Sequence, residues 1–131
     1  MDMIENEAVG TFDVKLAPIG AGDSPIGGMS IDKTFHGDLQ GGSVGQMLAF
    51  RSGVEGSAGY VAMERVTGTL AGKRGSFTLQ HSGLMDKGAQ SLTVVVVPDS
   101  GTEGLSGLAG TMNIIVTAGK HGYQFRYTLG A

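Results

Sequence analysis

Two side chains of this sequence could move a proton between them and a bound molecule, the carboxyl group of Glu64 and the imidazole of His81. Each lies in a segment of alternating apolar and polar residues, which is typical of a β-strand with one buried face. If 58–71 and 74–82 form a hairpin closed by Gly72-Lys73, Glu64 faces His81 on the apolar side. A carboxylate and an imidazole so placed can act as general acid and base, so both are candidate catalytic residues.

A second interpretation of this pair needs no ligand. An ionised carboxylate in an apolar interior is unfavourable unless it is paired. His81 could supply the hydrogen bond or the compensating charge that Glu64 requires. The two would then form a satisfied internal pair, or would lie at a rim where both reach water. Structural pairs also perturb titration, so both interpretations stay open at this point.

Further polar side chains are expected to face the same interior and to orient the polar group of a small, largely apolar ligand. These candidate ligand-binding residues are Gln46, Tyr60, Tyr123 and Tyr127. The tyrosines could instead fill the core and direct their hydroxyls to the mouth of the fold. Lys33 has the same inward parity, although near a strand end it could reach outward to water.

No residue spacing in the sequence has the character of a metal or cofactor site. The three histidines lie in three different expected strands, and there is no cysteine to serve as ligand, nucleophile or disulfide partner. His36 falls on a polar face, and His121 lies beside a turn. The glycine-rich stretch 101–110 does not link a parallel strand to a helix, so it is a poor phosphate loop. We expect neither a metal nor a cofactor.

The charge balance argues against nucleic acid as a partner. Twelve acidic and nine basic side chains give a formal net charge of −3, and the basic ones are scattered. The longest apolar run, within 92–97, is too short to cross a bilayer. Residues 1–6 are acidic and do not resemble a secretory signal. We therefore expect one cytoplasmic domain spanning 1–131, with no membrane partner.

Glycine is the strongest compositional signal, with 24 residues placed between runs of Val, Thr, Ile and aromatic residues. This pattern is typical of short strands joined by tight turns, not of a disordered linker. The expected strands are 8–17, 29–40, 43–52, 58–71, 74–82, 91–98, 110–118 and 121–129. One short helical turn is expected within 102–108.

Three glycine-containing turns set the expected register, at Gly41-Gly42, Gly72-Lys73 and Gly119-Lys120. Each of the three resulting hairpins has one apolar face and one polar face. Antiparallel strands of this kind avoid free edges best by closing, so we expect an all-β fold, an eight-stranded antiparallel up-and-down β-barrel. A two-sheet β-sandwich is the alternative. An eight-stranded barrel is either filled with side chains or holds one small ligand.

The parity of the expected strands also predicts that two methionines lie on the outer face, Met47 and Met63. Exposed methionine beside Ala49 and Val61 could form a patch for self-association into a homo-oligomer. Isolated apolar residues on the surface are the alternative, since these are common in soluble proteins.

Five stretches resemble a family of small bacterial proteins of unknown function. They are Gly10–Val14, Phe35–Leu39, the long central stretch Gly56–Leu70, Gly75–His81 and Val97–Thr102. Members of that family are held to share the barrel of plant allene oxide cyclase, so the resemblance implies an allene oxide cyclase-like β-barrel. Allene oxide cyclase closes a fatty-acid epoxide inside its barrel. Its working residues match no positions here, so the resemblance implies a fold and no activity.

Three functions are compatible with these features. The first is a binding module in which Glu64 and His81 meet the polar end of a small, largely apolar molecule. The second is an isomerase or cyclase in which the same pair moves a proton away from water. The third is a structural or interaction protein with a filled barrel. An open cavity near Glu64 would favour the first two over the third.

Overall fold

The computed structural model describes residues 5–20 and 24–130, which form eight strands and one short 3₁₀-helix. The strands are β1 Asn6–Ile19, β2 Gly27–Gly37, β3 Leu39–Arg51, β4 Ala58–Leu70, β5 Lys73–Asp86, β6 Ala89–Val96, β7 Leu108–Thr117 and β8 Lys120–Leu129. The helix, η1 (Glu103–Leu105), lies within the segment where a helical turn was expected.

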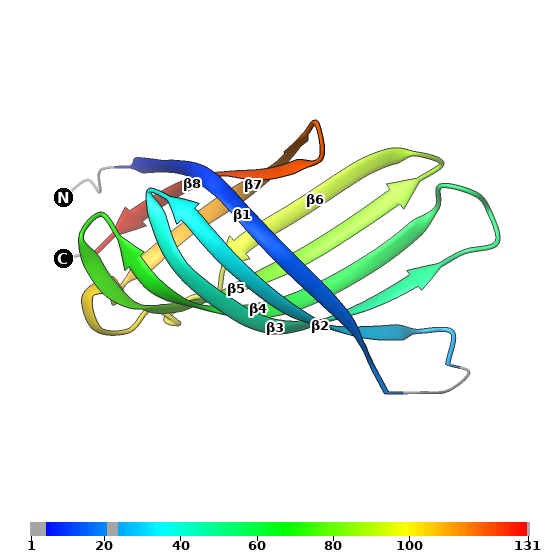
Figure 1. Cartoon of the computed structure of the whole chain (residues 1–131), viewed down its shortest axis with the longest axis horizontal. Coiled ribbons are helices and arrows are strands. Elements are labelled where there is room, and N and C mark those ends of the chain that lie inside the picture. The colour runs from blue at the N-terminus through cyan, green and yellow to red at the C-terminus, as the bar shows by residue number, and fades with distance from the viewer. Residues whose placement is uncertain (1–4, 21–23, 131) are drawn as a thin grey trace.

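Each strand pairs antiparallel with its neighbours in the sequence, and β1 also pairs with β8, which closes the sheet into a barrel (Figure 1). The predicted eight-stranded antiparallel up-and-down barrel is confirmed, and the sandwich alternative is excluded. Within the described ranges, no helix has the length and apolar character needed to span a membrane.

The β2–β3 hairpin turns at Asp38, earlier than predicted. Asp38 is tied to β1 twice, because its N–H donates to the Val9 carbonyl oxygen (3.1 Å) and its Oδ2 accepts from the Val9 N–H (2.9 Å). Phe35 consequently pairs with Gly41 and not with Leu48. This is an odd shift in register, which exchanges the two faces of β3.

The predicted Gly41-Gly42 turn was wrong because Gly41 has a different task. It faces the interior, where a Cβ would lie 2.2 Å from the carbonyl oxygen of Thr67 in β4. Glycine therefore permits a close approach of two strand backbones and does not form a turn. Met47 and Ala49, predicted to lie outside, face inward as a result, whereas Met63 is exposed as predicted.

The other two hairpins turn one residue earlier than predicted. Their loops are Ala71-Gly72 (φ 53° and 76°) and Ala118-Gly119 (φ 52° and 79°). Positive φ at both central residues is the signature of a type I′ turn. Partners shift by two positions, so each side chain keeps its face. His81 pairs with Ala62, and Glu64 is its diagonal neighbour on the same inner face.

One end of the barrel is closed by packing. Leu105 of η1 is fully buried and joins a core of apolar side chains. That core includes Phe12, Phe35, Leu39, Val66, Leu70, Phe77, Leu79 and Phe125. The loop before η1 is fastened to β5, because the Thr102 N–H donates to the Ser76 carbonyl oxygen at 2.9 Å.

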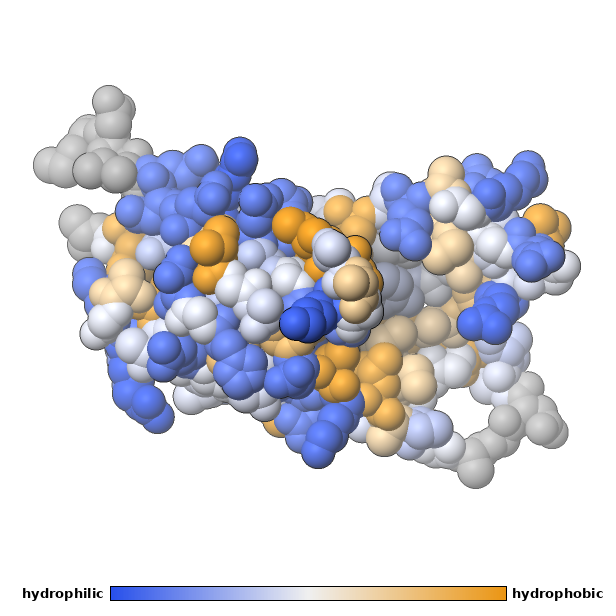
Figure 2. Space-filling model, turned by 45° about the horizontal axis from the view of Figure 1, so that its top comes forward, coloured by the Kyte–Doolittle hydropathy of each residue, from blue (hydrophilic) through white to orange (hydrophobic). Residues whose placement is uncertain are grey.

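The other end is open because neighbouring strands separate there. Among the described residues, β6 and β7 share a single bridge pair, Val95 with Thr111, and β1 pairs with β8 only from Asn6 to Phe12. The later part of β1 and the start of β6 therefore border an opening. The space-filling view shows a hollow near the middle of the molecule, with hydrophobic side chains beside it (Figure 2).

Candidate functional site

A buried charged network lies inside the barrel and centres on Glu64. Its Oε2 accepts from Lys33 Nζ at 2.8 Å and contacts His81 Nε2 at 2.5 Å, and its Oε1 accepts from Ser43 Oγ at 2.7 Å. Glu64 is 1% exposed, and its three partners are buried as well. Both carboxylate oxygens are thus engaged by donors, which is the condition for keeping a charge inside an apolar interior.

Glycine and two aromatic rings make room for this network. Gly45 in β3 pairs with Glu64, and a Cβ at Gly45 would lie 2.8 Å from the Glu64 Cβ. The missing side chain leaves room for Glu64 itself, which Lys33 in β2 reaches across β3. The Lys33 ammonium also lies 4.7 Å from the centroid of the Phe12 ring and 5.9 Å from that of Phe35, so aromatic faces replace part of its hydration.

The network holds the carboxyl group of Glu64 ionised. Burial by itself would raise its pKa, but the hydrogen bond from His81, the charge of Lys33 and the hydrogen bonds from Lys33 and Ser43 together outweigh burial. The pKa falls from 4.5 to about 2. Because an ionised carboxylate is an acceptor only, the proton between Glu64 and His81 resides on His81 Nε2.

The second ring nitrogen of His81, Nδ1, has no protein partner among the described residues. These residues contain no buried side-chain nitrogen or oxygen that lacks a hydrogen-bond partner. Nδ1 therefore keeps slight contact with solvent, while the side chain as a whole is 4% exposed and lies outside the cleft lining. A carboxylate that fixes one ring nitrogen leaves the other to accept or deliver a proton, as in carboxylate–histidine pairs of hydrolases.

Tyr60 stands between this network and a cleft at the open end. Its ring centroid is 6.4 Å from that of His81, and it packs on the backbone of Gly83, where a Cβ would lie 2.4 Å from the ring. Burial, and then the negative charge of Glu64, raises the pKa of the Tyr60 hydroxyl. The phenol is therefore a donor at neutral pH.

The cleft has a volume of about 420 Å³, within the range of small-molecule sites. It lies between the ends of β3, β4, β5 and β6. Its lining includes Met47, Arg51, Tyr60, Met85, Gln90 and Leu92. Apolar side chains with a few polar groups are the usual composition of such a site.

A family model described as "Protein of unknown function (DUF3224)" matches residues 8–127. The chain belongs to the DUF3224 family. A DUF3224 protein with unknown function from Shewanella oneidensis MR-1 shares 45% sequence identity with this chain. Its crystal structure superimposes on this one with a TM-score of 0.91. That match covers 98% of this chain and 99% of the other. No curated protein matches the chain. The expected resemblance to a family of unknown function is confirmed, whereas the allene oxide cyclase-like subtype stays a prediction.

In this DUF3224 member, the predicted site residues fall into three groups. Glu64 and His81 are in contact, and Tyr60 adjoins them. Tyr123 and Tyr127 face the interior as predicted, but they do not line the cleft. The Tyr123 hydroxyl accepts from the Leu39 N–H at 2.9 Å and donates to the His36 carbonyl oxygen at 2.9 Å, so it fastens the β2–β3 turn.

The prediction that Gln46 faces the interior was wrong. Gln46 is exposed on the outer face, because the earlier β2–β3 turn exchanges the two faces of β3. The same exchange brings Ser43 inward, where it binds Glu64, and sequence parity did not reveal this. Lys33 was placed inward by parity, but its pairing with Glu64 across β3 needed the true register. The described residues contain no group of three His, Asp or Glu side chains suited to a metal ion.

Proposed function

We propose that this protein binds a small, largely apolar molecule in the cleft at the open end of its barrel. The observation that carries the proposal is the contrast between the two ends. One end is packed solid around Leu105, whereas the other holds a cleft of about 420 Å³. The volume suits one ligand of modest size.

The apolar part of the ligand would lie against Met47, Met85 and Leu92. Methionine side chains adapt to irregular shapes because they are unbranched and polarizable. A polar group of the ligand would meet the Tyr60 hydroxyl, and the His81 imidazole lies next to the Tyr60 ring. Glu64 would not contact the ligand directly, because both of its oxygens are engaged by Lys33, Ser43 and His81.

Native mass spectrometry of protein purified from its own host tests this proposal. The unmodified protein should carry a molecule of defined mass. Ala49→Phe should lose it, because Ala49 faces inward and lines the cleft. Ala109→Phe is the matched control, since Ala109 is exposed on β7 and outside the cleft, and should keep the molecule.

Titration with the neutral dye Prodan provides a second measurement that does not depend on a copurified molecule. Ala49→Phe should weaken dye binding at least tenfold, and Ala109→Phe should leave it unchanged. A clean apoprotein whose dye binding is the same in both variants would refute the proposal.

A second candidate, an isomerase or cyclase, is supported by His81 Nδ1, which has no partner among the described residues, and by the Tyr60 ring 6.4 Å from the imidazole. In such a reaction His81 Nδ1 would take a proton from the ligand, and Glu64 would stabilise the imidazolium. His81→Gln distinguishes the two. If the pair is catalytic, the unmodified protein should convert the molecule found by mass spectrometry. The His81→Gln variant should then bind that molecule with the same affinity but no longer convert it. A molecule that is bound and recovered unchanged by both proteins indicates binding alone.

A further inference from the structure

The outer faces of β3, β4 and β5 carry an apolar surface that meets the cleft only at its edge, where Phe50 and Leu84 border both. Six side chains form it, and we call them the outer patch: Val44, Leu48, Phe50, Val61, Met63 and Leu84. Their exposed fractions run from 45% at Phe50 to 65% at Val44 and Leu84. Strand pairing makes the patch continuous, because Leu48 lies opposite Val61, and Phe50 and Leu84 flank Gly59.

The outer patch is large for a surface that faces only water. Six side chains about half exposed amount to roughly 500 Å², at the upper end of what single chains tolerate. With the neighbouring polar residues Gln46, Gln80 and Ser82, the face reaches roughly the 800 Å² per partner of a standard interface. Glutamine and serine on the strands that flank β4 mix polar groups with the apolar ones, as protein interfaces do.

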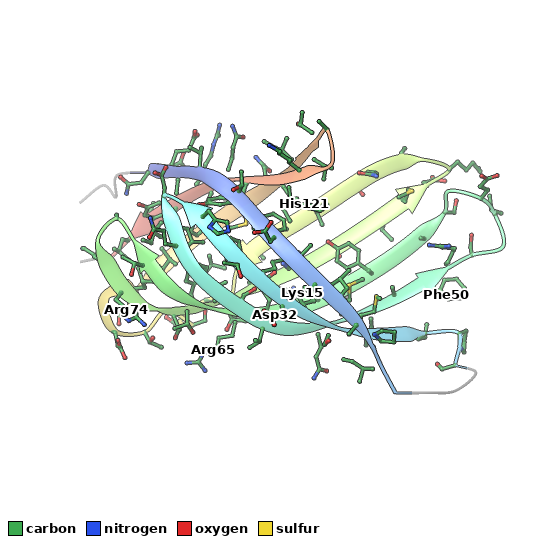
Figure 3. The ribbon with its side chains drawn as sticks, viewed as in Figure 1. Lys15, Asp32, Phe50, Arg65, Arg74 and His121 are labelled. Atoms are coloured by element: carbon green, nitrogen blue, oxygen red, sulfur yellow. The ribbon has the colours of Figure 1, made fainter. Side chains whose placement is uncertain are left out.

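Charges at the two ends of the patch identify the partner. Val61 pairs with Ser82 near its middle. Arg65 lies four residues beyond Val61 on β4, and Asp86 lies four residues beyond Ser82 on β5. Because these strands are antiparallel, the two charges lie in opposite directions, each about 13 Å from the Val61–Ser82 row. Arg65 extends away from the barrel wall (Figure 3).

A second copy of this chain complements that arrangement. A two-fold axis across the strands at the Val61–Ser82 row exchanges the two ends of the patch. Arg65 of one copy then lies over Asp86 of the other, and the reverse contact forms at the far end. Asp86 takes part in none of the ion pairs of the described residues, and Arg65 uses one donor on Ser76 Oγ at 3.1 Å. Its guanidinium retains further donors for a carboxylate.

We propose that the outer patch is the interface of a homodimer, in which the β3–β4–β5 faces of two copies pack about this axis. Face-to-face sheets pack about 10 Å apart, which apolar side chains from both faces fill. The same surface serves both copies, as a two-fold interface requires. The four other patch residues do not line the cleft: Val44, Leu48, Val61 and Met63.

Sedimentation velocity and light scattering at about 50 µM test the proposal. The unmodified protein should have twice the 13.4 kDa mass of the chain. Val61→Glu should be monomeric by both methods, because it places a charge at the centre of the patch. Its circular dichroism spectrum should show that it is folded. Arg65→Glu and Asp86→Arg should each weaken the dimer at least tenfold, since like charges then face each other.

The combined Arg65→Glu/Asp86→Arg variant should restore the dimer. This variant and Arg65→Glu both lack the Arg65–Ser76 hydrogen bond, so loss of that bond could not explain why only the single variant dissociates. Arg74→Glu, a charge reversal outside the patch, should leave the dimer intact. A monomeric unmodified protein would overturn the proposal and leave the patch to another partner. A dimer that survives Val61→Glu, or single reversals that the combined variant does not repair, would overturn it too.

Discussion

Replacing Glu64 by glutamine tests whether the buried network is held together by charge. The glutamine side chain is nearly the same size, so packing around the site is preserved while the negative charge is lost. Lys33 then remains buried without a counterion, and His81 loses an ionised acceptor. Removal of one partner from a buried pair typically costs about 3–5 kcal/mol, because the other charge is left uncompensated.

The pKa of Glu64 gives an independent magnitude. Its fall from 4.5 to about 2 corresponds to about 3 kcal/mol of stability at neutral pH. A group whose pKa is lower in the folded protein contributes this stability above pH 4.5 and loses it as the pH falls toward 2. The free-energy difference between the unmodified protein and Glu64→Gln should therefore be constant near pH 7 and shrink below pH 4.5.

Urea unfolding at a series of pH values measures this difference. We expect a loss of about 3 kcal/mol at pH 7, equivalent to about 10 °C in melting temperature. Glu7→Gln is the matched control, because Glu7 is exposed and 3.6 Å from Arg126, and should change stability by at most about 0.5 kcal/mol. A Glu64→Gln loss below about 1 kcal/mol, or curves that stay parallel from pH 7 to 2.5, would refute the reasoning.

The remaining predictions concern three other positions. Tyr123→Phe leaves a buried backbone N–H without its acceptor, and urea unfolding should report a loss of about 1–3 kcal/mol; an unchanged midpoint would contradict the role of the hydroxyl. Gly45→Ala places a methyl group 2.8 Å from the Glu64 Cβ and should lower the melting temperature, whereas Gly53→Ala, with nothing within 4 Å, should have little effect. Lys33→Met should raise the pKa of Glu64 above about 2, as measured by NMR titration of the carboxyl carbon, and a pKa that stays near 2 would rule out a role for the ammonium charge.

Local sequence patterns were enough to predict the architecture and half of the candidate site. Alternation of apolar and polar residues identified the strands, and short turns between them implied neighbouring antiparallel pairs. Glu64 and His81 were placed on one inner face even though the predicted turn was one residue late. Such an error shifts the partners by two positions, and a period of two leaves every side chain on its own face.

The tertiary structure alone decided which glycines make turns and which let strands approach. Gly41 looks like a turn residue in the sequence, but it is required where β3 passes close to β4. That single difference moves the turn to Asp38, sends Gln46 outward and brings Ser43 to Glu64. Sequence spacing cannot separate the two uses of glycine, because both arise from the absence of a side chain, and only the neighbouring strand shows which one applies.

The opening of one barrel end was also beyond the sequence. The avoidance of free strand edges predicts a closed sheet, but the separation of β7 from the part of β6 before Val95 depends on how far each pair of strands stays in register around the whole ring. The sequence by itself thus determined the strands, their order and the inward direction of an acid and an imidazole. The tertiary structure decided their partners and placed the cleft on the far side of Tyr60, because side-chain parity is a local property and closure belongs to the entire barrel.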